Sequence, residues 1–182
     1  LPIKESIIFP SSYCPSCGTK LKYYDLVPIF SYLYNKGKCR YCGGEISLRY
    51  PIVELLTALL FLFTFLKYGL NSEFIIFSFF IASLIVISFI DIKYQIIPNE
   101  ITFSFIPLSL LSSLIFNHIT FINSLLGLII PAGLLLLIAL IYKKGMGIGD
   151  VKLIGMIGTF IGWKYALISI FIGALVGSIY GI

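Results

Sequence analysis

Long apolar stretches, separated by short polar connectors, fill the chain after Pro51. A helix that spans a bilayer needs about 20 mostly apolar residues, and roughly 17 suffice. Six stretches approach this length: 52–68, 74–91, 101–116, 121–142, 151–163 and 165–182. The stretch 151–163 is too short to cross untilted, and its glycines predict close packing between helices. The pattern therefore predicts an all-α polytopic membrane protein with about six transmembrane helices.

The composition excludes a water-soluble globule, because 59% of the residues are hydrophobic and only 12% are charged. Polar residues gather at the N-terminal end, which also carries all four cysteines. We therefore predict two domains, a small cytoplasmic tetracysteine module over residues 1–51 and a transmembrane domain over residues 52–182. The first residue is not a methionine and the last residues are apolar, so we expect a piece of a longer protein.

Basic residues near helix ends predict the orientation of the chain, because they are retained on the cytoplasmic side of a membrane. The N-terminal module, Lys93 and the pair Lys143 and Lys144 are then cytoplasmic. Counting crossings from residue 51 gives the same assignment. This topology predicts that Asp91 and Asp150 lie on the same face of the membrane.

Two CxxC pairs, 21 residues apart, predict a structural zinc site. Four thiolates can close a tetrahedral shell around one zinc ion, and the glycine after each pair, Gly18 or Gly43, suits the turn that brings both sulfurs to the metal. The expected ligands are Cys14, Cys17, Cys39 and Cys42. Two disulfides are the alternative, and they would require an oxidising compartment. Catalytic zinc is not predicted, because the sequence contains no HExxH and only one histidine, His118.

Two carboxylates at membrane depth are the candidate catalytic pair. Asp91 ends an apolar run, and Asp150 follows GMGIG at the start of another. An ionisable group at that depth costs about 3 kcal/mol or more, so it is retained mainly for function or because it is paired. Two aspartates that share a proton and hold a water can hydrolyse a peptide bond, one as base and the other as acid. Three further residues are expected to shape this site: Gly147, Gly149 and Pro98, the last by breaking the helix after Asp91.

Other interpretations of the same residues remain open. Each aspartate alone is compatible with a helix-end role, with Asp150 capping a helix and paired to Lys152 or Lys93. A second hypothesis is a membrane transporter whose two carboxylates relay protons or ions. A third is a zinc-anchored docking protein without enzymatic activity. The sequence predicts a lipid bilayer as partner and no nucleic acid.

The chain resembles the type IV prepilin peptidase family over nearly its whole length. Four segments carry the resemblance in the same order: CPSCG, LKYYDLVPIFSYLYNKGKCRYCGGEISLRYPIVELL, FIDIKYQIIPNEIT and GMGIGDVKLIGMIG, which contains GxGD. The family's catalytic aspartates match Asp91 and Asp150, and its four cysteines match those named above. Glu54 matches a family glutamate whose role the residues do not reveal, and it is the candidate residue for methyl transfer.

This resemblance implies an aspartic endopeptidase of the bacterial cytoplasmic (inner) membrane, with its active site facing the cytoplasm. The implied reaction is removal of a short basic leader after a glycine, with a prepilin or pseudopilin as substrate. Family members commonly also methylate the new N-terminus with S-adenosylmethionine. The family usually has one more spanning helix ahead of Leu1 and continues beyond residue 182, so methylation by this chain is a separate expectation.

Overall fold

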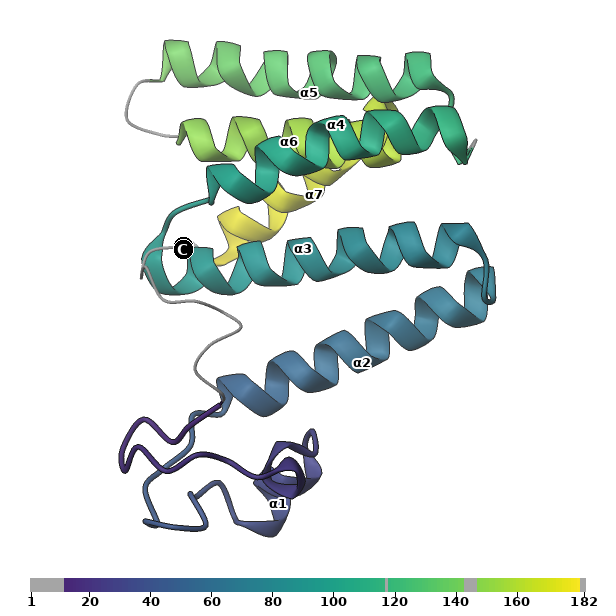
Figure 1. Cartoon of the computed structure of the whole chain (residues 1–182). Helices are drawn as coiled ribbons and strands as arrows, with labels where there is room; N and C mark the ends of the chain where they lie inside the picture. Colours follow the sequence, from purple (N-terminus) through teal and green to yellow (C-terminus); the bar gives the residue numbers. More distant parts are fainter. Residues whose placement is uncertain (1–11, 117, 143–146, 181–182) are drawn as a thin grey trace. The chain divides into compact units, whose positions relative to one another are not determined.

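The computed structural model describes residues 12–116, 118–142 and 147–180. The helices follow one another as η1 (Tyr23–Leu26), α1 (Phe30–Tyr34), α2 (Arg49–Tyr68), α3 (Ser72–Tyr94), α4 (Asn99–Ile115), α5 (Phe121–Ile141), α6 (Ile148–Ile161) and α7 (Trp163–Tyr180), as Figure 1 shows. The β-structure of these residues is confined to two isolated bridges, Tyr13 with Lys20 and Lys38 with Glu45. The prediction of an all-α protein is therefore confirmed for the described part of the chain.

The chain divides into two compact units, Leu1–Gly69 and Leu70–Ile182. The first contains η1, α1 and α2, together with the four cysteines, and the second contains α3 to α7. In the first unit, Asp25 at the end of η1 contacts the second CxxC segment. Its carboxylate accepts a hydrogen bond from the Tyr41 hydroxyl at 2.8 Å and lies 3.5 Å from the Arg40 guanidinium.

Three of the described helices, α2, α3 and α5, are long and apolar enough to cross a membrane. Helices α4 and α7 are apolar but shorter, and α6 has only 14 residues. The chain is a membrane protein on these grounds, because apolar helices of this length match the hydrocarbon thickness of a bilayer. Within the described residues, every predicted stretch contains a helix, but the predicted number of six crossings is not confirmed.

Helix α6 is the centre of the second unit, where it packs against α5, α4 and α7. It approaches α5 closely, since a side chain on either Gly127 or Gly158 would collide with the backbone carbonyl of the other. At the same crossing, the Ser124 hydroxyl of α5 donates to the backbone oxygen of Thr159 at 2.5 Å. Small residues and short polar side chains are typical of helix contacts in membranes. The close packing predicted from the glycines of this segment is thus confirmed.

A cluster of buried side chains joins α3 to α6. Phe80 and Ile87 come from α3, and Met156 and Phe160 come from α6. The rings of Phe80 and Phe160 are stacked, with their centroids 4.1 Å apart and an interplanar angle of 3°. The two helices run antiparallel, so the end of α3 and the start of α6 lie at the same end of this unit (Figure 1).

Helix α3 ends between Asp91 and Pro98. The last helical residue is Tyr94, and Gln95 takes a left-handed conformation with φ 52°. Pro98 lies three residues later, where it precedes the first turn of α4. Its backbone is extended, with φ −64° and ψ 124°, as is usual for the residue that precedes a helix. Pro98 is the N-cap of α4, and the expectation that it limits the helix after Asp91 and shapes the site stays a prediction.

Candidate active site and metal centre

Asp91 occupies the last turn of α3 and is exposed. Residues at spacings of three and four lie on one face of a helix. Phe80, Leu84 and Ile87 precede Asp91 at such spacings, and all three belong to the cluster shared with α6. Asp91 therefore continues the face of α3 that packs towards α6.

Asp150 occupies the first turn of α6 and is also exposed. Leu153, Ile157 and Phe160 follow it at spacings of three and four, and they pack in the same cluster. Asp150 thus extends the face of α6 that packs towards α3. The two aspartates lie at the ends of two helix faces that contact each other.

The stacked rings allow the levels of the two aspartates to be compared. Asp91 lies 11 residues after Phe80, and Asp150 lies 10 residues before Phe160. With a rise of about 1.5 Å per residue, the aspartates are about 16.5 Å and about 15 Å from the stacked pair, measured along the two helix axes. Because α3 and α6 are antiparallel, both distances run towards the same end of the unit.

The connection between α3 and α4 touches the segment that contains Asp150. A Cβ atom at Gly149 would lie 3.3 Å from both Cβ and Cδ1 of Ile97, which is a tight contact. One turn further into α6, the Lys152 ammonium donates to Asn99 Oδ1 at 2.9 Å. These two contacts hold the start of α6 against the segment that follows Asp91.

Neither aspartate has a side-chain hydrogen bond or an ion pair within the described ranges. The alternative in which Asp150 caps α6 and pairs with Lys152 does not describe this arrangement, because the N-cap is Gly147 and Lys152 contacts Asn99 instead. Lys93 lies 4.8 Å from the ring of its neighbour Tyr94. Among the described residues, no side chain therefore occupies either carboxylate.

Sequence reasoning did not identify Ile97 and Asn99 as part of this region. Both are ordinary loop or helix-start residues in the sequence, within IIPNE. Ile97 contacts Gly149, 52 positions away, and Asn99 is bonded to Lys152, 53 positions away. The PN dipeptide marked a turn but not the partner against which that turn packs.

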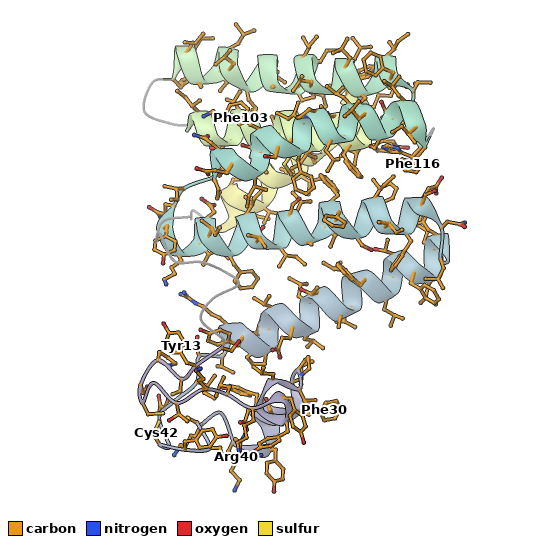
Figure 2. All side chains as sticks on the ribbon, viewed as in Figure 1. Tyr13, Phe30, Arg40, Cys42, Phe103 and Phe116 are labelled. Carbon is orange, nitrogen blue, oxygen red and sulfur yellow. The ribbon has the colours of Figure 1, made fainter. Side chains whose placement is uncertain are left out.

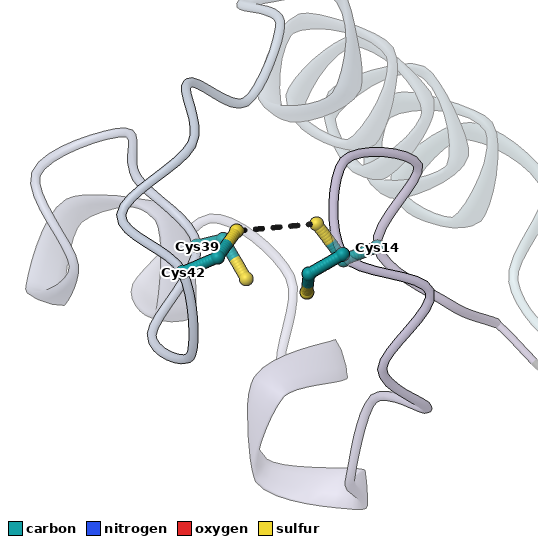
Figure 3. Close-up of side chains that lie close together, drawn as sticks. Cys14, Cys39 and Cys42 are labelled. Atoms are coloured by element: carbon teal, nitrogen blue, oxygen red, sulfur yellow. Dashed lines mark hydrogen bonds between the residues drawn. The ribbon is translucent and has the colours of Figure 1, made fainter.

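The four cysteines gather in one cluster in the first unit. Their Sγ atoms all lie within 4.8 Å of one another, and Figure 3 shows the approach of Cys14 to Cys42, whose sulfurs are 3.9 Å apart. A tetrahedral zinc site with Zn–S bonds of about 2.3 Å places its sulfurs about 3.8 Å apart. All four thiols are free, and the first of each pair, Cys14 or Cys39, is buried. This donor set can hold a metal ion and fits zinc.

The two CxxC segments have the same local structure. In each, the N–H of the glycine after the second cysteine donates to the carbonyl of the first, and both glycines, Gly18 and Gly43, have φ near 70°. Each segment is closed by an isolated β-bridge between two residues that are seven positions apart. The bridge joins Tyr13 to Lys20 in the first segment and Lys38 to Glu45 in the second. Left-handed φ values favour glycine, which explains why one follows each pair.

Backbone N–H groups in these turns point at sulfur. Those of Cys17 and Ser16 lower the pKa of the Cys14 thiol, and that of Cys42 has the same effect on the pKa of Cys39. The N–H of Gly44 likewise acts to lower the pKa of Cys42, but the neighbouring thiols and burial raise it to about 11. Because the thiolate is the form that ligates a metal, binding of a divalent cation would release the protons that remain.

Glu54 has a definite partner in the first unit. Its Oε2 atom accepts a hydrogen bond from the backbone N–H of Ile29 at 2.8 Å. Ile29 precedes α1 and has φ 63°, which is unusual for a β-branched residue. In this structure, Glu54 therefore joins the second turn of α2 to the start of α1.

The comparisons with known proteins match both parts of the chain. Residues 1–68 match the bacterial peptidase A24 N-terminal domain, and residues 78–182 match the type IV leader peptidase family. The chain belongs to the type IV leader peptidase family. The resemblance inferred from the four sequence segments is thereby confirmed.

Several relatives of this leader peptidase family member carry the name prepilin leader peptidase/N-methyltransferase. The protein of Bacillus subtilis (strain 168) is 38% identical over 181 residues, which are 100% of this chain and 73% of that protein. The protein of Neisseria gonorrhoeae is 34% identical over 97% of this chain and 64% of its own length. The protein of Myxococcus xanthus (strain DK1622) is 31% identical, and the match covers 100% of this chain and 56% of that protein. No solved structure matches the chain.

Proposed function

We propose that the chain is an intramembrane aspartyl endopeptidase that removes the basic leader from type IV prepilin-like proteins, with Asp91 and Asp150 as its catalytic pair. Membership of the type IV leader peptidase family supports the reaction and the substrate class. The observation that supports the pair is the register of α3 and α6. Phe80 and Phe160 stack at 4.1 Å, and both aspartates lie at nearly the same axial distance from them.

In this proposal the two carboxylates share one proton and hold a water between them. One carboxylate removes a proton from the water as it attacks the scissile carbonyl, and the other, protonated, donates to the carbonyl oxygen. The roles belong to the pair as a unit and are not assigned to one residue. Gly147 and Gly149 leave the backbone beside Asp150 free of side chains, so that an extended substrate can approach it.

The proposed orientation places this pair at the cytoplasmic face of the bacterial inner membrane. Lys93, close to Asp91, and the basic residues of the first unit support it, because such residues are retained inside. The predicted pair Lys143 and Lys144 lies outside the described residues. A basic leader that has not been exported would meet the pair on this side.

Replacing either aspartate tests the mechanism. In a cleavage assay with a prepilin leader and the full chain in nanodiscs, Asp91→Asn and Asp150→Asn should each lose at least about a hundredfold in kcat/KM, because general acid–base catalysis contributes that much or more. Glu100→Gln is the matched control, since Glu100 lies in the first turn of α4 at the same end of the unit. Wild-type cleavage by either aspartate variant would exclude the proposed pair. Proton flux without cleavage would favour the transporter hypothesis instead.

We also propose, on the names of the relatives, that the new N-terminus is methylated with S-adenosylmethionine as donor, with Glu54 as a residue to test. Glu54 is hydrogen-bonded to Ile29, and the groove of about 500 Å³ beside α1 includes Arg40 and no carboxylate to face a cationic sulfonium. Methyl transfer measured with wild type and Glu54→Gln tests this step separately, while cleavage by the same variant should be retained.

A further inference from the structure

Helix α1 presents a large apolar face that the described residues do not cover. Phe30, Leu33 and Tyr34 are 73%, 67% and 80% exposed, and their spacings of three and four place them on one side of the helix. Leu26 and Val27 of the preceding turn are exposed as well. This set of five residues is called the α1 face below. A soluble module would not leave so many large apolar side chains together in water.

The depth of α1 follows from its hydrogen bond to α2. Ile29, which precedes α1, donates its N–H to Glu54 at 2.8 Å, and Glu54 is five residues after Arg49, where α2 begins. Helix α2 has 20 residues, so it is about 30 Å long and matches the hydrocarbon core of a bilayer. If Arg49 marks the boundary of that core, Glu54 lies about 7.5 Å inside it. Amphipathic helices in the interface are immersed by about 5–10 Å.

The arrangement around α2 agrees with this depth. Figure 2 shows Phe30 displaced from the start of α2 in the direction in which α2 runs, whereas Tyr13 and Cys42 are displaced in the opposite direction. The cysteine cluster therefore lies on the polar side of the first unit, and the α1 face lies on the apolar side. The bond to Ile29 also gives the Glu54 carboxylate a donor, which such a group requires at this depth.

Charge favours an anionic surface as the partner of the α1 face. Residues 12–51 contain six Lys or Arg residues and only two Asp or Glu residues, and Asp25 is already bonded to Tyr41 and paired with Arg40. Lys22 and Arg40 lie over the ring of Tyr24, beside the groove that continues the α1 face. Aromatic rings with neighbouring cations are typical of proteins at the level of lipid head groups. A basic leader peptide would instead be repelled by this surface.

We propose that α1 is an interfacial helix, which Glu54 fixes beside α2 and whose face of Leu26, Val27, Phe30, Leu33 and Tyr34 rests in the head-group region of an anionic bilayer. The contact holds the cysteine module at the membrane surface and limits its motion about the start of α2. This inference depends on α2 crossing the membrane and does not depend on the catalytic pair.

Fluorescence quenching in nanodiscs tests the proposal with the full chain. The single native tryptophan is removed as Trp163→Phe, and Phe30→Trp then introduces an indole on the α1 face. Tyr13→Trp in the same background is the matched control, because it is also an aromatic exchange in the first unit but lies on the polar side. Both exchanges keep an aromatic ring, so neither is expected to prevent folding.

In phosphatidylglycerol nanodiscs, the Phe30→Trp indole should be quenched by lipids brominated close to the head group and shielded from aqueous iodide. The Tyr13→Trp indole should show the reverse. Quenching at position 30 should weaken when phosphatidylcholine replaces the anionic lipid, because the basic residues then lose their partners. Equal quenching in both lipids would exclude the proposed preference of the α1 face for an anionic bilayer.

Two outcomes would overturn the interfacial placement. Strong quenching of the Phe30→Trp indole by iodide, as at position 13, would show that the α1 face is in water. Shielding from both iodide and brominated lipid would show that a protein, either another copy or a substrate, covers it. A third variant, Glu54→Leu, removes the acceptor for Ile29 and should make the position 30 indole more accessible to iodide.

Discussion

The rings of Phe80 and Phe160 stack face to face, 4.1 Å apart, and so set the register of α3 against α6. Each ring is fixed on a helix that also carries one of the two candidate catalytic aspartates. Because helices are stiff, a fixed point 10 or 11 residues away determines the level of the aspartate at the helix end. The packing of side chains in the core of the second unit therefore positions the proposed active site.

We predict that Phe160→Ala lowers cleavage although Phe160 is far from the aspartates along the helix. Removing a buried phenylalanine costs about 3–5 kcal/mol and leaves a cavity into which α3 or α6 can shift. A misplacement of about 1 Å can cost roughly a hundredfold in rate. Phe171→Ala is the control, because Phe171 is 65% exposed on α7. Unchanged kcat/KM for Phe160→Ala would mean that the register does not depend on the stacked pair.

Gly149 should tolerate no side chain without loss of activity. A Cβ there would lie 3.3 Å from Ile97, so that Gly149→Ala displaces the segment after Asp91 by a few tenths of an ångström, and Gly149→Leu displaces it further. We expect roughly a tenfold loss of cleavage for alanine and about a hundredfold loss for leucine. Adding Ile97→Ala should restore part of the activity of Gly149→Ala. Gly173→Ala, where nothing lies within 4 Å, should cleave like wild type.

Metal analysis of the purified chain should find close to one zinc per molecule, because the four sulfurs form one cluster. Cys39→Ser should lose most of this zinc and make the first unit more sensitive to limited proteolysis, since structural zinc contributes folding free energy. Ser16→Ala, a change within the CxxC segment at a residue that is not a ligand, should keep it. Purified wild-type chain with intact disulfides and no zinc would contradict the assignment.

His118 should make the second unit less stable in mild acid. Its ring packs against Phe77 and Phe160, and burial lowers its pKa below the usual value for histidine. The unfolded chain therefore binds a proton more readily, so stability is complete above about pH 6.5 and falls as the pH decreases from there. His118→Phe keeps an aromatic ring at this position but cannot bind a proton. The Tm of wild type should drop between pH 8 and pH 5, and that of the variant should drop less.

An equal drop for wild type and His118→Phe would assign the acid sensitivity to other groups. Glu73 is the charged group that acts on His118, and it raises the pKa of the ring. Glu73→Gln should therefore lower the pKa of His118 further, and its Tm should drop more between pH 8 and pH 5 than that of wild type. This second variant separates the effect of burial from the effect of charge.

The sequence by itself determined the class of the protein, the helices and the cysteine cluster. Apolar run length identifies helices that need lipid, because the backbone in a bilayer must satisfy its hydrogen bonds within each segment. The CxxC spacing identified the cluster because each pair acts locally, through a turn that its glycine permits. Helix ends were less predictable: Gln95, with a left-handed φ, ends α3 before Pro98 is reached.

Only the tertiary structure decided which helix faces meet. Uniformly apolar helices carry little sequence signal for their buried side, since lipid and core select the same side chains. The stacking of Phe80 on Phe160, the contact of Ile97 with Gly149 and the bond from Ile29 to Glu54 each join residues distant in the chain. Such contacts depend on how whole helices pack, and local pattern does not encode them.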